Sequence, residues 1–206
     1  LNSDKTVINH ASIDLDTTIW LEERCQQVGA SFLNAPFTGS KVAAAEGQLV
    51  YYAGCDDADL DRFRLFLNAT SKRIIPLGSA IHATVIKLTT NLISASTVQA
   101  LAEALRINQA FGIPADVFQE AVSTNACASV LAGMKIPTMA AGDFSPHFSL
   151  ANMLKDARYV VDLASRHGLE TPGIATTAGR MQELTDRGCG ELDFSALFQQ
   201  FPPHDA

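Results

Sequence analysis

Three groups of residues in this sequence have types and spacings that could carry chemistry. In the first, Thr38, Gly39 and Ser40 end the segment Asn34-Ala35-Pro36-Phe37-Thr38-Gly39-Ser40, which follows an expected strand. Hydroxyl groups beside a glycine at a strand-to-loop turn can present O–H and backbone N–H donors to an anion. The spacing alone favours an ordinary turn, so this segment is a candidate binding loop only in combination with other signals.

The second group is Lys87 and Asn91, which are four residues apart and therefore share one face of a helix, together with Thr84. Their immediate neighbours are mostly apolar. Partial burial would disfavour the charged lysine and let it exchange a proton with a substrate hydroxyl near neutral pH. The alternative is a lysine at the helix edge, with its stem on the core and its ammonium group in water.

The third group is Phe148 with Lys155 and Asp156, in a stretch whose apolar residues have helical spacing. A lysine and an aspartate could supply and position charge at a binding site. The alternative is the exposed face of an amphipathic helix, where ion pairs are common and contribute little to stability.

Composition excludes several classes of function. The chain has 206 residues, of which 47% are hydrophobic, and a net charge of −7, so it can bury a sizeable core. An acidic chain without a Lys/Arg cluster is not expected to bind nucleic acid or an anionic membrane, although one lysine can still hold a small carboxylate. Its cysteines form no CxxC pair and its histidines have no ligand spacing. We therefore expect free thiols, no metal site and a reducing, cytoplasmic location.

The first part of the chain alternates strands and helices. Strands are expected at 6–9, 31–33, 48–53 and 73–76, with helices that Asp14 or Asp16 and then Asp56 or Asp57 can begin. Strands that alternate with helices indicate βα units and a largely parallel sheet.

The second part is predicted to be helical only. No glycine or proline occurs between Ser79 and Phe111, and apolar residues recur at helical spacing, which predicts one amphipathic helix of about 30 residues. Further helices are expected from Pro114, over 130–139, 149–166 and 172–187, and a short one over 193–200. The sequence thus predicts an α/β domain over 1–78 followed by an all-α domain over 79–206.

Together the three groups resemble motifs of the β-hydroxyacid dehydrogenases, which include 3-hydroxyisobutyrate dehydrogenases, tartronate semialdehyde reductases and glyoxylate/succinic semialdehyde reductases. The segment 34–40, with Ala43-Ala44 and Gly47-Gln48-Leu49, resembles the substrate-binding loop of that family. Lys87-Leu88-Thr89-Thr90-Asn91 after Gly78 resembles its catalytic lysine motif. Phe148 through Lys155-Asp156 resembles its C-terminal lysine–aspartate motif.

This resemblance implies a particular fold. The family has an N-terminal Rossmann-type domain, a long interdomain helix and a C-terminal helical domain. The resemblance runs from about Val7 to about Phe198. The sequence contains no GxGxxG, the glycine-rich fingerprint that holds dinucleotide phosphates at the start of such domains. We therefore expect 1–78 to be the C-terminal remnant of a Rossmann-type domain, in a product that is truncated, cut or one part of a two-part assembly.

The resemblance also implies roles for individual residues. Lys87 would be the general acid in reduction and the general base in oxidation, and Asn91 would orient the substrate and the lysine. Thr38, Gly39 and Ser40 would hold the substrate carboxylate. Residues expected near the cofactor are Ser12, Phe148, Lys155 and Asp156, and Lys155 would add positive charge near the substrate as well.

The implied activity is hydride transfer between a nicotinamide and a small β-hydroxyacid or aldehyde acid. NAD and NADP both remain possible, with a slight preference for NADP, and the expected assembly is a homodimer or tetramer. One alternative is a non-catalytic dimerisation fragment of such an enzyme. Another is an imine reductase relative, which Lys87 disfavours because those enzymes usually replace this lysine.

Three regions of the sequence depart from the pattern of the family. Thr38 stands where serine is usual, which keeps a hydroxyl but adds a methyl group. Ile81 and Ala83 stand where glycines are frequent. The expected first strand continues into His10-Ala11-Ser12-Ile13 instead of the usual Ser-Thr, so the geometry around the nicotinamide is expected to differ from that of the family.

Overall fold

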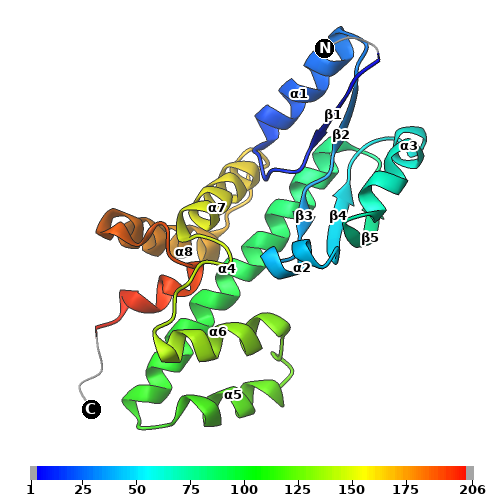
Figure 1. Cartoon of the computed structure of the whole chain (residues 1–206). Helices are drawn as coiled ribbons and strands as arrows, with labels where there is room; N and C mark the ends of the chain where they lie inside the picture. The colour runs from blue at the N-terminus through cyan, green and yellow to red at the C-terminus, as the bar shows by residue number, and fades with distance from the viewer. Residues whose placement is uncertain (1–3, 203–206) are drawn as a thin grey trace. The chain divides into compact units, whose positions relative to one another are not determined.

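The computed structural model of the chain describes residues 4–202 and divides into two compact units, Leu1–Thr90 and Asn91–Ala206 (Figure 1). The first unit contains β1 (Thr6–Asn9), α1 (Leu15–Gln27), β2 (Ser31–Asn34), β3 (Phe37–Thr38), α2 (Lys41–Ala45), β4 (Leu49–Ala53), α3 (Asp57–Asn68), β5 (Ser71–Pro76) and the start of α4 (Ala80–Ala110). The second contains the rest of α4, then α5 (Ala115–Ser123), α6 (Val130–Ala141), α7 (Leu150–Ser165), α8 (Pro172–Leu184), the π-turn η1 (Thr185–Cys189) and the 3-10 helix η2 (Phe194–Gln200).

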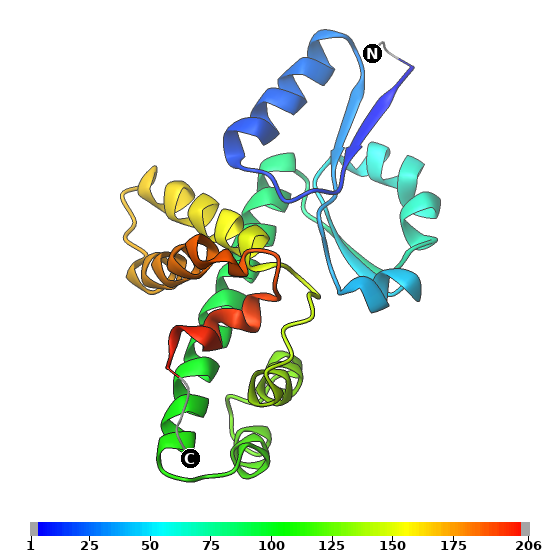
Figure 2. The same cartoon turned by 60° about the vertical axis from the view of Figure 1, so that its left-hand side comes forward.

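The first unit is built from two parallel strand pairs. β1 pairs with β2 through the crossover helix α1, and β4 pairs with β5 through α3. The short strand β3 runs antiparallel to β4 (Figure 2). The expected alternation of strands and helices is confirmed, whereas β3 and α2 fall within stretches for which the sequence suggested only a loop.

Aspartates begin the two crossover helices. Asp14 accepts a hydrogen bond from the backbone N–H of Thr17 at 2.7 Å, and Asp56 accepts one from that of Asp59 at 2.8 Å. Each carboxylate satisfies a donor that a helix N-terminus leaves without a partner. Of the candidate residues at each position, Asp14 and Asp56 are therefore the caps.

A glycine lets α4 begin directly against the sheet. A Cβ atom on Gly54 would lie 2.4 Å from the carbonyl oxygen of Ser79 and 2.7 Å from Cβ of Ala83. Only a residue without a side chain allows this approach. Gly54 also exchanges two backbone hydrogen bonds with Asn34, so the end of β2, the end of β4 and the start of α4 meet at one point.

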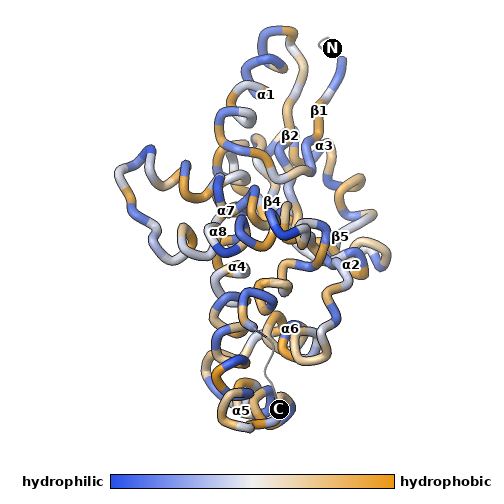
Figure 3. The backbone as a smooth tube through the Cα atoms, turned by 90° about the vertical axis from the view of Figure 1, so that its left-hand side faces the viewer, coloured by the Kyte–Doolittle hydropathy of each residue, from blue (hydrophilic) through white to orange (hydrophobic). Residues whose placement is uncertain are grey.

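The second unit packs helices around the C-terminal part of α4. Buried residues of α4 and α6, with Val122 of α5, form one core. Hydrophobic and hydrophilic residues are interleaved along these helices (Figure 3), as expected for elements with one buried face. The predicted helix of about 30 residues is confirmed, since α4 has 31. α6 continues past Pro137 to Ala141, and the short element after Asp193 is a 3-10 helix.

A buried ion pair joins α6 to the end of the unit. Nζ of Lys135 lies 2.6 Å from Oδ1 of Asp193, and the two side chains are 4% and 2% exposed. The other oxygen of Asp193 accepts hydrogen bonds from the backbone N–H groups of His147 and Phe148. The lysine ammonium also sits 4.8 Å from the centre of the Phe194 ring. This carboxylate therefore fixes the loop that leads into α7.

Two further observations concern the described residues. None of their helices combines the length and the apolar character needed to cross a membrane. No group of three histidine, cysteine, aspartate or glutamate side chains within residues 4–202 is arranged to hold a metal ion.

Replacing Lys135 by methionine should lower the free energy of unfolding by about 3–5 kcal/mol, because it leaves a buried carboxylate without its cation. Arg180→Met is the matched control, because it breaks an ion pair on the protein surface: the side chains of Arg180 and Glu183 are 50% and 62% exposed. It should lower the free energy of unfolding by less than about 1 kcal/mol. Urea denaturation followed by circular dichroism measures both. Equal losses in the two variants would contradict a structural role for the buried pair.

The same pair predicts a pH dependence. Burial alone would raise the pKa of Asp193, but the hydrogen bond from Lys135, those from the backbone N–H and hydroxyl of Ser195, and the charge of Lys135 together lower it. A lowered folded-state pKa gives stability that is present above the unfolded value and is lost as the pH falls through the folded value.

In Lys135→Met, Asp193 should take up a proton at higher pH than in the wild type, which relieves the unpaired charge. The difference in unfolding free energy between the two proteins should therefore narrow as the pH is lowered from about 6 to about 3, around the ordinary aspartate pKa. Denaturation curves at a series of pH values measure the unfolding free energy of both proteins. A difference in unfolding free energy that stays constant with pH would show that the protonation of Asp193 is not its cause.

Candidate functional site

The carboxyl ends of β1 and β2 carry two asparagines that face each other across the strand pair. Asn9 and Asn34 are register partners, and Nδ2 of Asn9 donates to Oδ1 of Asn34 at 2.8 Å. The Asn34 side chain is fully buried. In open parallel sheets, ligands bind outside the carboxyl ends of the strands, so this edge is where a site is expected.

From Asn34 a chain of buried hydrogen bonds leads to α4. Nδ2 of Asn34 donates to the hydroxyl of Thr84 at 2.8 Å and to the carbonyl of Ala80 at 2.9 Å. The Thr84 hydroxyl in turn lies 2.7 Å from that of Thr18 on α1. Buried polar groups are costly unless they are hydrogen-bonded. This network therefore fixes the first turns of α4 relative to the strand ends, and Lys87 lies one turn beyond Thr84.

The candidate binding loop leaves this edge through β3. Thr38 and Gly39 are exposed, and Ser40 begins α2 without a capping hydrogen bond from its side chain. Gly39 has a φ of +128°, and a Cβ atom there would approach Ala43 and Leu49 to 3.0 Å, so glycine is required. The hydroxyls of Thr38 and Ser40 make no side-chain hydrogen bond to another described residue and can face a ligand.

Lys87 is partly buried on α4, next to the fully buried Leu88. Asn91 follows four residues later on the same continuous helix. The helix geometry therefore gives the amine and the amide a common face, as the sequence predicted.

In the second unit, Asn91 is held by a buried carboxylate. Nδ2 of Asn91 donates to Oδ2 of Asp156 at 2.6 Å, and Asp156 is fully buried on α7. An ionised carboxylate can only accept hydrogen bonds, so this contact requires the NH2 group of Asn91 to point at Asp156 and places its carbonyl oxygen on the other side of the amide. The sequence paired Asp156 with Lys155 and did not anticipate the contact with Asn91.

Lys155 lies beside the same carboxylate. Its Nζ is 2.9 Å from Oδ1 of Asp156 and 5.2 Å from the centre of the Tyr159 ring. Oδ1 accepts no hydrogen bond from a described residue, so we regard the contact as an ion pair with poor hydrogen-bond angles. The Lys155 side chain is 37% exposed and can still meet an anionic ligand.

The remaining candidates lie in loops. Ser12 is half-buried in the segment between β1 and α1. Phe148 precedes α7, where its ring packs edge-on against Phe194 at 6.4 Å and its backbone N–H donates to Asp193 at 3.3 Å. The structure thus brings Asn91, Lys155 and Asp156 together, while Thr38, Gly39, Ser40 and Ser12 belong to the first unit.

Sequence reasoning missed the role of His10. Its Nδ1 lies 2.8 Å from the carbonyl oxygen of Ala35, and its ring packs 5.0 Å from that of Tyr51 and 6.4 Å from that of Phe37. His10 thereby holds the start of the binding loop. A polar residue directly after a short strand was the available signal, and it was interpreted only as a departure.

Comparisons with known proteins find two matching families, one for each part of the chain. The family described as NAD-binding of NADP-dependent 3-hydroxyisobutyrate dehydrogenase matches residues 82–201, and the NAD binding domain of 6-phosphogluconate dehydrogenase matches residues 1–78.

Individual relatives extend over most of the chain. Glyoxylate/succinic semialdehyde reductase 2 of Arabidopsis thaliana is 28% identical over 97% of the chain, and the chain spans 56% of that protein. The cytokine-like nuclear factor N-PAC of Drosophila melanogaster is also 28% identical, over 95% of the chain and 33% of its own length.

Among solved structures, 3-hydroxyisobutyrate dehydrogenase from Salmonella typhimurium has the same fold, with a TM-score of 0.89, 22% identity and coverage of 98% of this chain and 70% of its own. The predicted fold, an α/β part with Rossmann-type topology followed by a helical part, is therefore confirmed. The family match over more than half of the residues leads to one conclusion: the chain belongs to the β-hydroxyacid dehydrogenase family, in which 3-hydroxyisobutyrate dehydrogenase is included.

Proposed function

We propose that the chain carries the catalytic residues of an NAD(P)-dependent reductase that transfers hydride between a nicotinamide and a small β-hydroxyacid or aldehyde acid. The observation that carries this proposal is the pairing of Asn91 with the buried Asp156, four residues after Lys87 on α4. Burying a carboxylate to hold an amide is costly, and this suits a site whose polar groups must keep one orientation.

Lys87 is the proposed general acid and base. Reduction of an aldehyde acid needs a proton at the carbonyl oxygen, and the reverse reaction needs a base for the hydroxyl proton. The carbonyl oxygen of Asn91 can accept a hydrogen bond from the substrate hydroxyl or from the lysine, because its NH2 group is directed at Asp156. Asp156 therefore acts in this proposal by orienting Asn91.

The substrate carboxylate is assigned to the binding loop and to Lys155. The loop offers uncharged donors, namely the hydroxyls and backbone N–H groups of Thr38, Gly39 and Ser40. Lys155 adds a positive charge. The relative from Arabidopsis, named for glyoxylate and succinic semialdehyde, favours a short aldehyde acid as the substrate class.

The residues present fit the nicotinamide end of a dinucleotide. Parallel β1 and β2 end in polar side chains at one edge, where such rings bind in this type of fold, and Ser12 follows there. Bound there, the nicotinamide would supply or accept the hydride. Phe148, Lys155 and Asp156 remain proposed cofactor residues. Of the two cofactors, we propose NADP with a slight preference over NAD. We also propose that the domains span 1–78 and 79–206 and that the protein is cytoplasmic.

A second candidate function is a non-catalytic assembly module, for which an exposed stripe on α4 offers a contact surface. Ile93, Ala100 and Ile107 recur every seven residues with Thr97 and Ala104 between them, which is the spacing of a helix–helix contact. Ile93 and Ile107 are 63% and 59% exposed. Glu103 is the one charged residue between Leu88 and Leu105, and depletion of charge is typical of interface cores. The stripe supports a homodimer, with or without catalysis.

Lys87→Ala should lower kcat about 10²- to 10⁴-fold, the usual contribution of general acid–base catalysis, while the protein stays folded. Oxidation of NADPH and NADH with succinic semialdehyde or glyoxylate measures turnover, and circular dichroism measures folding. Lys72→Ala, at an exposed lysine on β5, is the control and should keep normal turnover.

Two results would separate the candidates. A Lys87→Ala protein with near-normal kcat would refute the catalytic assignment. A wild-type chain that neither binds millimolar cofactor nor oxidises it, yet forms a stable dimer, would favour the assembly module.

Ala100→Glu should shift the protein from dimer to monomer, because it places a charge in the middle of the apolar stripe. Leu169→Glu is the matched control: Leu169 is 63% exposed but lies beyond α7, away from the stripe. Sedimentation velocity at several concentrations measures both. Dimers of unchanged affinity in Ala100→Glu would show that the stripe is not the interface.

A further inference from the structure

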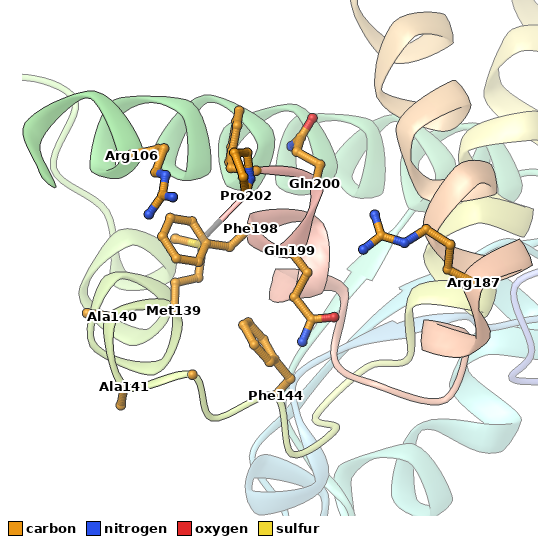
Figure 4. Close-up of a pocket in the computed structure, with 12 residues that line it drawn as sticks. Arg106, Met139, Ala140, Ala141, Phe144, Arg187, Phe198, Gln199, Gln200 and Pro202 are labelled. Carbon is orange, nitrogen blue, oxygen red and sulfur yellow. The ribbon is translucent and has the colours of Figure 1, made fainter. Parts of the chain in front are cut away.

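The second unit contains a cavity of about 750 Å³ that involves none of the candidate site residues. It lies between α4, the C-terminal end of α6, η1, and η2 with the two residues that follow it (Figure 4). Ligand sites for small organic molecules have volumes of about 300–1,000 Å³. The size of the cavity is therefore suited to one such molecule.

Two arginines enter this cavity from different elements. Arg106 comes from α4 and Arg187 from η1, and their guanidinium groups approach from opposite sides (Figure 4). Arg106 donates to the neutral amide oxygen of Gln109 at 3.1 Å. Arg187 donates to no acceptor among the described residues.

This pattern differs from that of Arg166 and Arg180 in the same unit, whereas Arg158, which lies outside the cavity, also donates to a neutral amide, that of Gln182. Arg166 pairs with Asp162 at 2.8 Å and Arg180 with Glu183 at 3.0 Å, in a chain whose net charge is −7. Two guanidinium groups without a carboxylate partner in residues 4–202, directed into one cavity, form an anion-binding arrangement. Guanidinium groups bind carboxylates, sulfonates and phosphates through paired N–H donors.

The rest of the lining is mainly apolar. Phe144 and Phe198 present rings to the cavity, Met139 lies beside Phe198, and the side chain of Gln199 extends toward Phe144 (Figure 4). Aromatic rings can stack on a planar ligand and bury a large apolar area. A fully hydrated inorganic ion would leave these surfaces unused.

We propose that this cavity binds an organic anion with an aromatic or other apolar body. The acidic group is held by Arg106 and Arg187, and the apolar body packs on Phe144 and Phe198. The site is independent of the proposed reductase activity, since Lys87, Asn91 and Lys155 do not line it.

Two fluorescent probes with the same rings test this proposal on the full chain. 8-Anilinonaphthalene-1-sulfonate carries a sulfonate, and N-phenyl-1-naphthylamine has the same aromatic body without it. We expect saturable binding of one sulfonate probe per chain, and binding of the uncharged probe that is weaker by about tenfold, which corresponds to about 1.4 kcal/mol.

Substitutions locate the site. Arg106→Gln and Arg187→Gln should each weaken binding of the sulfonate probe by about tenfold, the effect of losing one charge-assisted hydrogen bond. Arg180→Gln, which removes an arginine outside the cavity, should leave it unchanged. Equal affinities for the two probes, or unchanged affinity in both cavity variants, would overturn the proposal. Neither readout involves a nicotinamide, so failure here and failure of the reductase assignment remain distinguishable.

Discussion

The first unit depends on a chain of hydrogen bonds that runs from the partly buried Asn9 through the buried Asn34 and Thr84 to Thr18. The amide of Asn34 and the hydroxyl of Thr84 would be costly to bury alone, and their side-chain hydrogen bonds form only when the end of β2, α1 and α4 lie in one arrangement. Gly54 makes the arrangement possible because it lets the backbone of α4 reach the sheet. The position of Lys87 follows from this constraint, since the network fixes the helix turn that precedes it.

The second unit uses two buried aspartates in different ways. Asp193 is neutralised by Lys135 and accepts hydrogen bonds from the backbone N–H groups of His147 and Phe148, so it stabilises the loop before α7. Asp156 is also buried, but it holds the side-chain amide of Asn91 and lies beside the half-exposed Lys155. The first carboxylate maintains the fold, whereas the second sets which atoms of a polar site face a ligand. Hydrophobic burial alone would provide neither function.

Much of the architecture could be predicted from the sequence, because periodicity and helix signals are local. The absence of glycine and proline from Ser79 to Phe111 predicted α4, and aspartate caps predicted α1 and α3. The segments β3 and α2 were missed because two- and five-residue elements have no periodicity to detect. The contact between Asn91 and Asp156 joins residues 65 positions apart, and no local pattern reports such a pair.

The Lys135–Asp193 pair also constrains how the sequence can change over evolutionary time. The two residues are 58 positions apart, yet either one alone would be an uncompensated charge in the core. A lineage can lose the pair only through a neutralising change at both positions, or through an intermediate that tolerates the loss of stability. Positions 135 and 193 should therefore covary among homologues and act as one inherited unit, although Lys135 lies in α6 and Asp193 precedes η2.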